Sequence, residues 1–195
     1  MKKYFKKILG KKIDLIDLNL SYLNDFHSYS LEKKLYNHLV NLKPPKNKNE
    51  SKKYLKSLIL RSSKNNANWW FIYLKDEEKV IGTFGVKNMN FKRKSFEIVF
   101  AISPNYWGKG IFSEILYLII DRFIIKNNFQ RIFVITYSDN LNAIYSLKNN
   151  FFVEESELKD VFINRASKST NVSILSFCKD YDLKKYLNKI KKRFI

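Results

Sequence analysis

Cysteine, glycine and proline are all scarce in this chain of 195 residues. A single cysteine, Cys178, excludes a disulfide framework and a zinc site built from cysteine ligands. Five glycines and three prolines exclude collagen-like and low-complexity classes. No apolar run approaches the roughly 20 residues that cross a bilayer, and the N-terminus lacks the apolar core of a secretory signal. We therefore expect a soluble, cytoplasmic protein.

Acidic residues are also few, with 18 Asp and Glu against 37 Lys and Arg, so the net charge is +19. Such a surface is typical of a protein with an anionic partner: nucleic acid, a membrane or a phosphorylated substrate. Codon usage is an alternative cause, because lysine, asparagine and isoleucine all use AT-rich codons. Only six of the basic residues are arginine, the residue that reads base edges best. We therefore expect no specific nucleic-acid partner.

Hydrophobic residues make up 45% of the chain, enough for one domain with its own core. We predict a single domain over residues 1–178 and a basic amphipathic helix over residues 179–195. The apolar residues of this tail have helical spacing: Leu183, Tyr186, Leu187, Ile190 and Phe194. The tail could make peripheral contact with an anionic membrane, cap the domain core or contact a second subunit, and docking on protein is favoured. A monomer and a homodimer both remain open.

The hydrophobic pattern predicts strands and helices that alternate along much of the chain. The expected strands are 13–18, 69–74, 80–86, 96–102, 132–137, 153–156 and 171–178. The expected helical segments are 20–40, 50–62, 113–126 and 141–149. This order indicates an α/β domain on a mixed sheet, in which the strand–helix–strand unit over 96–137 forms a parallel pair.

One segment, Phe96–Phe112, carries the clearest chemical signal: FEIVFAISPNYWGKGIF. A strand is followed by a loop with Gly108 and Gly110, and a helix starts directly after the loop. Glycines let a ligand approach the backbone, and the first N–H groups of a helix attract anions. Lys109 adds a positive charge, so the loop is suited to a pyrophosphate. The glycine spacing matches neither the Walker A loop nor the dinucleotide-binding fingerprint.

The run E-I-V-F-A-I-S-P-N-Y-W-G-K-G-I resembles the cofactor-binding motif of the GNAT N-acetyltransferases. It is closest to the branch that acetylates ribosomal-protein N-termini (RimJ/RimL-like) and amino sugars. The matching positions are Glu97, Pro104, Tyr106, Trp107, Gly108, Lys109 and Gly110. The resemblance covers residues 9–178 and implies an acetyl-CoA-dependent N-acetyltransferase. It also implies the GNAT fold, a mixed and mostly antiparallel sheet with splayed central parallel strands and helices on both faces.

The resemblance assigns roles to individual residues. Glu97 is the expected general base, and the backbone of Phe100 and Ile102 is expected to polarise the thioester carbonyl. Asn140 is expected to hold the cofactor arm, although an N-cap is its other reading. The backbone N–H groups from Gly108 to Phe112, which include Lys109, Gly110 and Ile111, are expected to hold the pyrophosphate, and Trp107 is a further expected cofactor contact.

Acceptor contacts are expected from Tyr36 and Trp70. Trp69 and Trp70 are adjacent, so they face opposite sides of a strand, one toward the core and the other toward the acceptor. We expect no metal, since two histidines without carboxylates beside them make no convincing metal site.

The chain departs from the family pattern at three positions. Phe112 replaces a small residue, so it either crowds the pantetheine or repacks the helix. Phe151 replaces a glycine. Leu147 stands where the family has a tyrosine that protonates the leaving thiolate, and Tyr145 should face elsewhere on the helix. The general acid is therefore expected to be missing.

We expect a small-molecule amine as the acceptor, and a nucleotide-linked amino sugar, which fits the basic surface, is the first possibility. A protein N-terminal amine is the second possibility, and an antibiotic or polyamine amine the third. The competing class is an inactive GNAT-like module that binds nucleic acid or anionic membrane.

Overall fold

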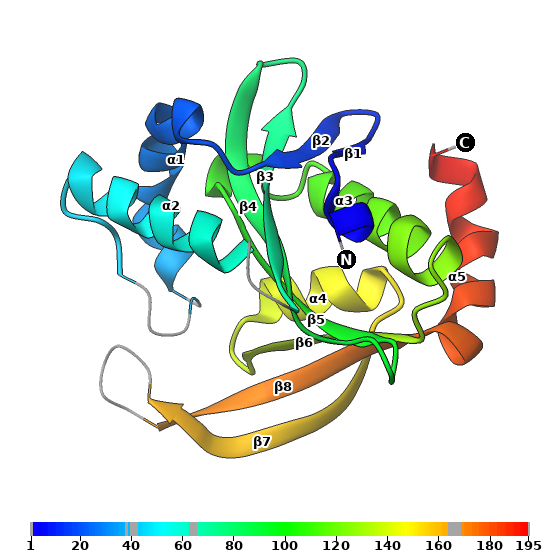
Figure 1. Ribbon diagram of the computed structural model, residues 1–195. Helices are drawn as coiled ribbons and strands as arrows, with labels where there is room; N and C mark the ends of the chain where they lie inside the picture. Colours follow the sequence, from blue (N-terminus) through cyan, green and yellow to red (C-terminus); the bar gives the residue numbers. More distant parts are fainter. Residues whose placement is uncertain (1, 38, 40–42, 63–65, 164–168, 195) are drawn as a thin grey trace.

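The computed structural model describes residues 2–37, 39, 43–62, 66–163 and 169–194. Its eight-stranded sheet has the order β1-β2-β3-β4-β5-β6-β8-β7 (Figure 1). The strands are β1 Ile8–Leu9, β2 Ile13–Asp17, β3 Asn68–Leu74, β4 Lys79–Asn90, β5 Ser95–Ile102, β6 Arg131–Tyr137, β7 Val153–Ile163 and β8 Ser169–Cys178. The helices are α1 Leu23–Ser30, α2 Lys48–Ser62, α3 Ile111–Ile119, α4 Leu141–Asn149 and α5 Lys179–Phe194. Short 3-10 turns cover Lys2–Phe5, Leu20–Tyr22, Lys33–Tyr36 and Pro104–Tyr106, and a π-helical turn, Ile120–Ile125, continues α3.

Helices cover both faces of the sheet, with α1 and α2 on one side and α3 and α5 on the other (Figure 1). Neighbouring residues of β3 divide between the two faces because side chains alternate along a strand. Phe71 packs with α1 and α2, whereas Trp70 and Ile72 pack in the larger cluster with α3. Two buried apolar clusters therefore hold the helices against the sheet.

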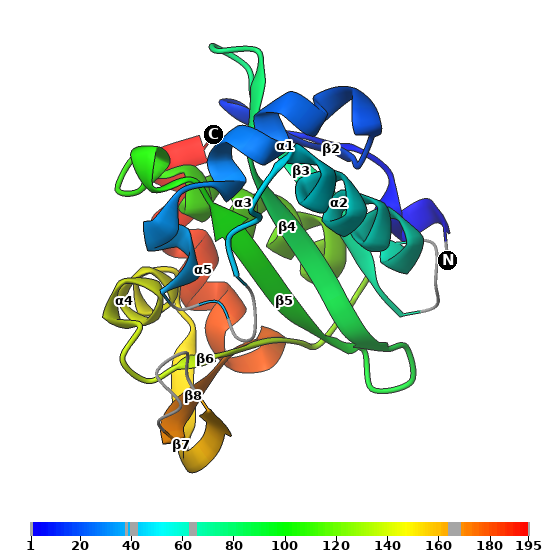
Figure 2. The same ribbon diagram turned by 90° about the vertical axis from the view of Figure 1, so that its left-hand side faces the viewer.

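The parallel pair of β5 and β6 is short and then splays. Its pairing ends at Glu97 opposite Phe133, although β5 continues to Ile102. β6 pairs with β8 along its whole length, from Arg131 to Tyr137, and Figure 2 shows β5 and β6 diverging beyond their last pair. One edge of β5 is therefore left without a neighbouring strand over 98–102, a stretch that is fully described. The predicted fold, with splayed parallel strands at the centre of a mostly antiparallel sheet, is confirmed.

Several predicted boundaries change. The last two strands are longer than expected, 153–163 and 169–178. Most of β7 is exposed, so its sequence carries too little apolar alternation to reveal its length. The predicted helix over 113–126 begins two residues earlier, at Ile111, and its second half is π-helical. In its described part, the predicted helical stretch over 20–40 has one α-helix between two 3-10 turns.

The C-terminal helix α5 packs on the main core. Tyr186 is completely buried and makes edge-to-face contacts with Phe151 and Phe177. Leu183 and Leu187 pack partly against the same cluster. The side chains expected to extend this apolar stripe, Ile190 and Phe194, lie outside the described ones. In the described ranges no helix combines the length and hydropathy needed to cross a bilayer.

Candidate active site

The glycine loop between β5 and α3 has the backbone that its sequence predicts. Gly108 and Gly110 have φ of 75° and 78°, in the left-handed region that favours glycine. A Cβ at either position would meet no atom within 4 Å, so the space beside the loop is open. Gly110 is the N-cap residue of α3, whose first N–H groups are free to bind an anion. The loop therefore fits the pyrophosphate of a nucleotide cofactor.

Side chains fix this loop to its surroundings. Trp107 Nε1 donates a hydrogen bond of 2.7 Å to the carbonyl of Ile102. The Tyr106 hydroxyl donates one of 2.7 Å to Glu77 Oε2, which also pairs with Lys79 at 2.6 Å. Hydrogen bonds from Lys79 and Tyr106 lower the pKa of Glu77. Lys109 Nζ lies 5.0 Å from the centre of the Tyr106 ring, so its charge stays beside the loop.

A buried carboxylate that sequence reasoning missed anchors the first turn of α3. Glu114 Oε1 accepts hydrogen bonds from the backbone N–H groups of Lys11 at 2.6 Å and Lys12 at 2.8 Å. These residues form the turn between β1 and β2, so α3 is tied to a distant part of the chain. The only signal in the sequence is one acidic residue within a strongly apolar helix.

Glu97 lies at the last β5–β6 pair, at the point where the splay begins. It is buried, with only 4% of its surface exposed. Its Oε1 pairs with Lys87 Nζ at 2.9 Å, and its Oε2 accepts a hydrogen bond of 2.7 Å from Asn88 Nδ2. Lys87 is the cross-strand partner of Glu97, and Asn88 has φ of 53° in the irregular stretch of β4 that follows. The cross-strand register, which the sequence does not reveal, supplies both partners.

A cavity of about 380 Å³, termed the splay cavity below, opens between β5 and β6 beside Glu97. Residues 97–101 and 134–136 of the two strands form one wall, and α1, α2 and the turn at Lys33–Tyr36 form the other. It brings together four of the predicted residues: Glu97, Phe100, Asn140 and Tyr36. Ile102 does not line this cavity; its carbonyl accepts the bond from Trp107.

The two tryptophans of β3 exchange the places expected for them. Trp70 is completely buried in the main core, where its Nε1 donates to the carbonyl of Phe5 at 3.3 Å. Trp69, on the opposite face, lines the splay cavity. The structure therefore places Trp69, and not the predicted Trp70, on the side of the splay cavity. Alternation shows that two neighbours diverge, but only the helices around the strand decide which face is the core.

Tyr29 of α1 also lines the splay cavity and was not predicted. It is buried, and its hydroxyl has no hydrogen-bond partner of acceptable geometry among the described residues. Burial raises its pKa well above the ordinary value, and the nearby Thr83 side chain only partly offsets this rise. A neutral O–H donor without a partner costs about 1–3 kcal/mol inside a protein. This hydroxyl is therefore ready to bond to a ligand.

The departures from the family pattern have simple packing explanations. Phe112 packs against Phe100, with ring centres 4.3 Å apart and the rings tilted by 36°. Leu147 is completely buried in the core, and Tyr145 is 70% exposed, facing away as predicted. Phe151 has φ of 67°, a conformation that accounts for glycine in the family. Its ring packs against Tyr186 of α5.

Asn140 is the N-cap of α4. Its Oδ1 accepts a bond of 3.4 Å from the Ala143 N–H, and its Nδ2 donates to Thr136 Oγ1 at 3.1 Å. Ile111 is buried at the start of α3.

No group of three metal-binding side chains occurs among the residues that the structure describes.

Residues 13–150 match the family described as the acetyltransferase (GNAT) domain. The chain belongs to the GNAT family. A curated relative, the uncharacterized N-acetyltransferase p20 of Bacillus licheniformis, is 27% identical over 121 residues, which are 62% of this chain and 68% of p20. The protein is therefore an N-acetyltransferase with acetyl-CoA as the acetyl donor.

Solved GNAT structures share the fold at low identity. A GCN5-related N-acetyltransferase from Brucella melitensis has a TM-score of 0.81 at 14% identity, covering 90% of this chain and 79% of its own. RimL, the ribosomal L7/L12 alpha-N-protein acetyltransferase, in complex with coenzyme A, has 0.79 at 18%, covering 91% and 100%. The Microcin C7 self-immunity acetyltransferase MccE, in complex with acetyl-CoA and AMP, has 0.77 at 18%, covering 87% and 93%.

Proposed function

We propose that this GNAT enzyme acetylates a primary amine that enters the splay cavity, with Glu97 as the general base. The observation that carries the proposal is the position of Glu97. A buried carboxylate lies at the start of the splay, in a cavity bordered by the free edge of β5. The glycine loop follows the far end of the same strand, so one strand links the two halves of the site.

The residues of this chain divide the work between binding and proton transfer. Backbone N–H groups from Gly108 to Phe112, with the charge of Lys109, hold the pyrophosphate. Backbone N–H groups between Phe100 and Ile102 on the free edge of β5 polarise a carbonyl. When bound, acetyl-CoA supplies the reactive thioester. Asn140, already ordered by its cap bonds, offers its side chain to the cofactor arm.

Glu97 removes the proton that an ammonium group must lose before it can attack a carbonyl. Each of its oxygens already has one partner, Lys87 or Asn88, and keeps a second acceptor position for the amine or for a bridging water. These partners orient the carboxylate toward the cavity. Tyr29 donates its hydroxyl to the ligand that fills the cavity.

A nucleotide-linked amino sugar is the acceptor class that we propose first. Arg61 lines the splay cavity and favours an acceptor that carries negative charge. A protein N-terminal amine is the second class, supported by the likeness to the fold of RimL. A cationic polyamine fits less well, because a protein of net charge +19 repels it.

Calorimetry with acetyl-CoA tests the cofactor site, and thiol release with candidate amines tests turnover. We expect micromolar binding of acetyl-CoA, and CoA release that depends on an amino-sugar nucleotide or on a peptide with a free N-terminus. No binding at millimolar acetyl-CoA would contradict the proposal. Salt-sensitive binding of RNA, DNA or anionic vesicles without any turnover would instead favour the inactive module.

A further inference from the structure

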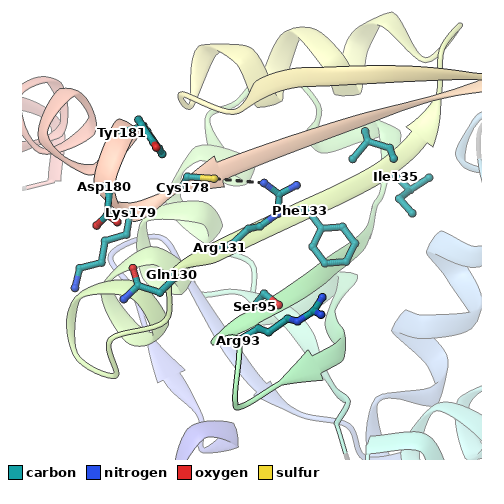
Figure 3. Close-up of a pocket in the computed structure, with 11 residues that line it drawn as sticks. Arg93, Ser95, Gln130, Arg131, Phe133, Ile135, Cys178, Lys179, Asp180 and Tyr181 are labelled. Carbon is teal, nitrogen blue, oxygen red and sulfur yellow. Dashed lines mark hydrogen bonds between the residues drawn. The ribbon is translucent and has the colours of Figure 1, made fainter.

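A second cavity, of about 570 Å³, lies on the face of β6 and β8 that carries Arg131, Phe133 and Ile135 (Figure 3). It is termed the β6–β8 cavity here. Phe133, Ile135 and Ile174 form an apolar floor. The polar and charged lining residues come from the β4–β5 hairpin, β6 and the start of α5: Arg93, Ser95, Gln130, Arg131, Lys179 and Asp180.

This cavity continues the splay cavity past Glu97. Phe133 is the strand partner of Glu97, so both side chains lie on the same face of the sheet. Ile135 lines both cavities. Arg131 lies two residues before Phe133 on β6, which corresponds to about 7 Å along a strand. A molecule whose amine reaches Glu97 can therefore extend over Phe133 toward Arg131.

The positions of the arginines indicate that the positive charge at this surface does not result from codon usage alone. Four of the six arginine side chains are described: Arg61, Arg93, Arg122 and Arg131. Three of these four line one of the two cavities. AT-rich codon usage accounts for many lysines, but it does not gather the few arginines around one site. Guanidinium groups bind phosphate and carboxylate through two parallel hydrogen bonds.

The two arginines of the β6–β8 cavity differ in their freedom. Arg131 is held by both oxygens of Glu155 and donates to Ser176 Oγ at 3.1 Å. Its guanidinium lies 5.9 Å from the centre of the Phe133 ring. Arg93 is exposed on the hairpin, and none of the described residues pairs with its guanidinium. In the view of Figure 3, Arg131 is drawn above the Phe133 ring and Arg93 below it.

Acidic groups near this end do not cancel the arginines. Glu155 is occupied by Arg131. Asp180 also lines the cavity, together with Lys179, whose Nζ donates to Asn128 Oδ1. Arg93 therefore supplies a positive charge that has no partner in the described structure.

We propose that the β6–β8 cavity is the distal half of the acceptor site and binds an anionic group of the acceptor. This inference rests on the proposed function. The group is a phosphate or a carboxylate. It lies about 7 Å from the reacting amine, because Arg131 is two strand residues away from Phe133, the partner of Glu97. Arg93 binds it, Arg131 and Gln130 contribute further donors, and the carbon skeleton between anion and amine rests on Phe133 and Ile135.

The binding test uses protein saturated with CoA, so that the glycine loop is already filled, and titrates inorganic pyrophosphate by calorimetry. We expect Arg93→Gln to weaken pyrophosphate binding at least fivefold. The matched control is Lys92→Gln, which removes the same charge from the neighbouring exposed residue outside the cavity. We expect less than a twofold effect from this control.

Equal effects of the two variants, or no pyrophosphate binding to CoA-saturated protein, would overturn the inference. Failure of CoA itself to bind would instead contradict the proposed function, so the two failures are distinguishable.

A kinetic test compares three amines of similar length: 4-aminobutyl phosphate, 5-aminopentanoate and 4-aminobutanol. We expect the KM of at least one anionic amine to be fivefold or more below that of the neutral one. Arg93→Gln should remove this preference and leave the KM for acetyl-CoA unchanged. Whichever of the two anionic amines has the lower KM shows whether the cavity prefers a phosphate or a carboxylate. A neutral amine used as well as both anionic ones would contradict the assignment.

Discussion

Glu97 acquires its chemical setting from residues that the sequence does not place beside it. Lys87 reaches it across the antiparallel register, and Asn88 reaches it because β4 is irregular there. A carboxylate held at both oxygens presents a fixed direction to the cavity, which suits the role of general base that we propose for Glu97. Glu97 itself was identified from its motif, whereas its two supporting residues were not.

Replacing Glu97 by glutamine tests the base directly. Glu97→Gln keeps the size and the hydrogen-bonding capacity of the side chain but removes its basicity. We expect turnover at neutral pH to fall at least tenfold, while calorimetry shows unchanged affinity for acetyl-CoA. Asn88→Ala should retain the base and lose part of its orientation, giving a smaller loss of turnover. If turnover of Glu97→Gln equals that of the wild type, Glu97 has no part in proton transfer.

Tyr29 and Tyr186 form a natural pair for a second test. Both are buried with unpartnered hydroxyls in the described structure, but only Tyr29 lines the splay cavity. Replacement of either by phenylalanine removes an unsatisfied O–H, so we expect no loss of unfolding free energy. Tyr29→Phe should raise the KM for the acceptor about fivefold, and Tyr186→Phe should not change it. Steady-state kinetics and urea unfolding separate the two effects; identical kinetics for both variants would exclude a ligand contact by Tyr29.

At the scale of elements, the loop and α3 form the unit that we propose to bind the cofactor. The loop is shaped by two glycines in the left-handed region, and α3 is held in place by Glu114 and the β1–β2 turn. The backbone also takes a left-handed conformation after the end of α4, where Phe151 has a positive φ of 67°. The contact with Tyr186 compensates for the backbone strain at this residue.

Gly110→Ala tests the loop. Its Cβ would meet no atom within 4 Å, so the cost arises from the backbone alone, about 1–2 kcal/mol for an alanine in the left-handed region. We expect affinity for CoA to fall about tenfold by calorimetry. Gly110→Asn should lose less, because asparagine tolerates this conformation. Equal losses in both variants would indicate steric exclusion of the cofactor instead of strain.

The ion pair of Arg131 and Glu155 connects β6 to β7 across β8. Hydrogen bonds from Arg131 lower the pKa of Glu155 from 4.5 to about 2. A carboxyl group whose pKa is lower in the folded than in the unfolded protein stabilises the fold at every pH above its unfolded pKa. This stabilisation is lost as the pH falls toward the folded pKa of about 2. The pair is partly exposed, so it contributes about 1 kcal/mol at most.

Urea unfolding of wild type and Glu155→Gln at pH 6, 4 and 2.5 checks this contribution. We expect the wild type to be more stable at pH 6, and the difference to shrink as the pH falls. The rising positive charge affects both proteins alike and cancels in the comparison. A difference that is independent of pH would exclude the ion pair as its cause.

At the scale of the whole molecule, α5 determines how the chain ends its fold. Its apolar residues Leu183, Tyr186 and Leu187 contact the main core. The same side chains cannot insert into a membrane surface while they are packed there. Burial of a large apolar side chain contributes about 1.5–3 kcal/mol. The tail is therefore expected to act as part of the domain.

Truncation after Cys178 tests the tail. We expect the unfolding free energy to fall by about 4 kcal/mol, because Tyr186 leaves its place against Phe151 and Phe177. Thermal unfolding followed by circular dichroism measures the loss, and Tyr186→Ala should reproduce most of it. A truncated protein of unchanged stability that no longer binds anionic vesicles would assign the tail to the membrane instead.

The sequence by itself determined the family, the order of most strands and helices, the glycine loop and the choice of Glu97 as the candidate base. These are local properties: periodicity, backbone freedom of glycine and a contiguous motif. Only the tertiary structure decided which tryptophan lines the splay cavity, which residues hold Glu97, where Glu114 binds, and that a second cavity adjoins the first. Each of these depends on strand register or on packing between distant segments, and a single residue of register turns every side chain to the other face.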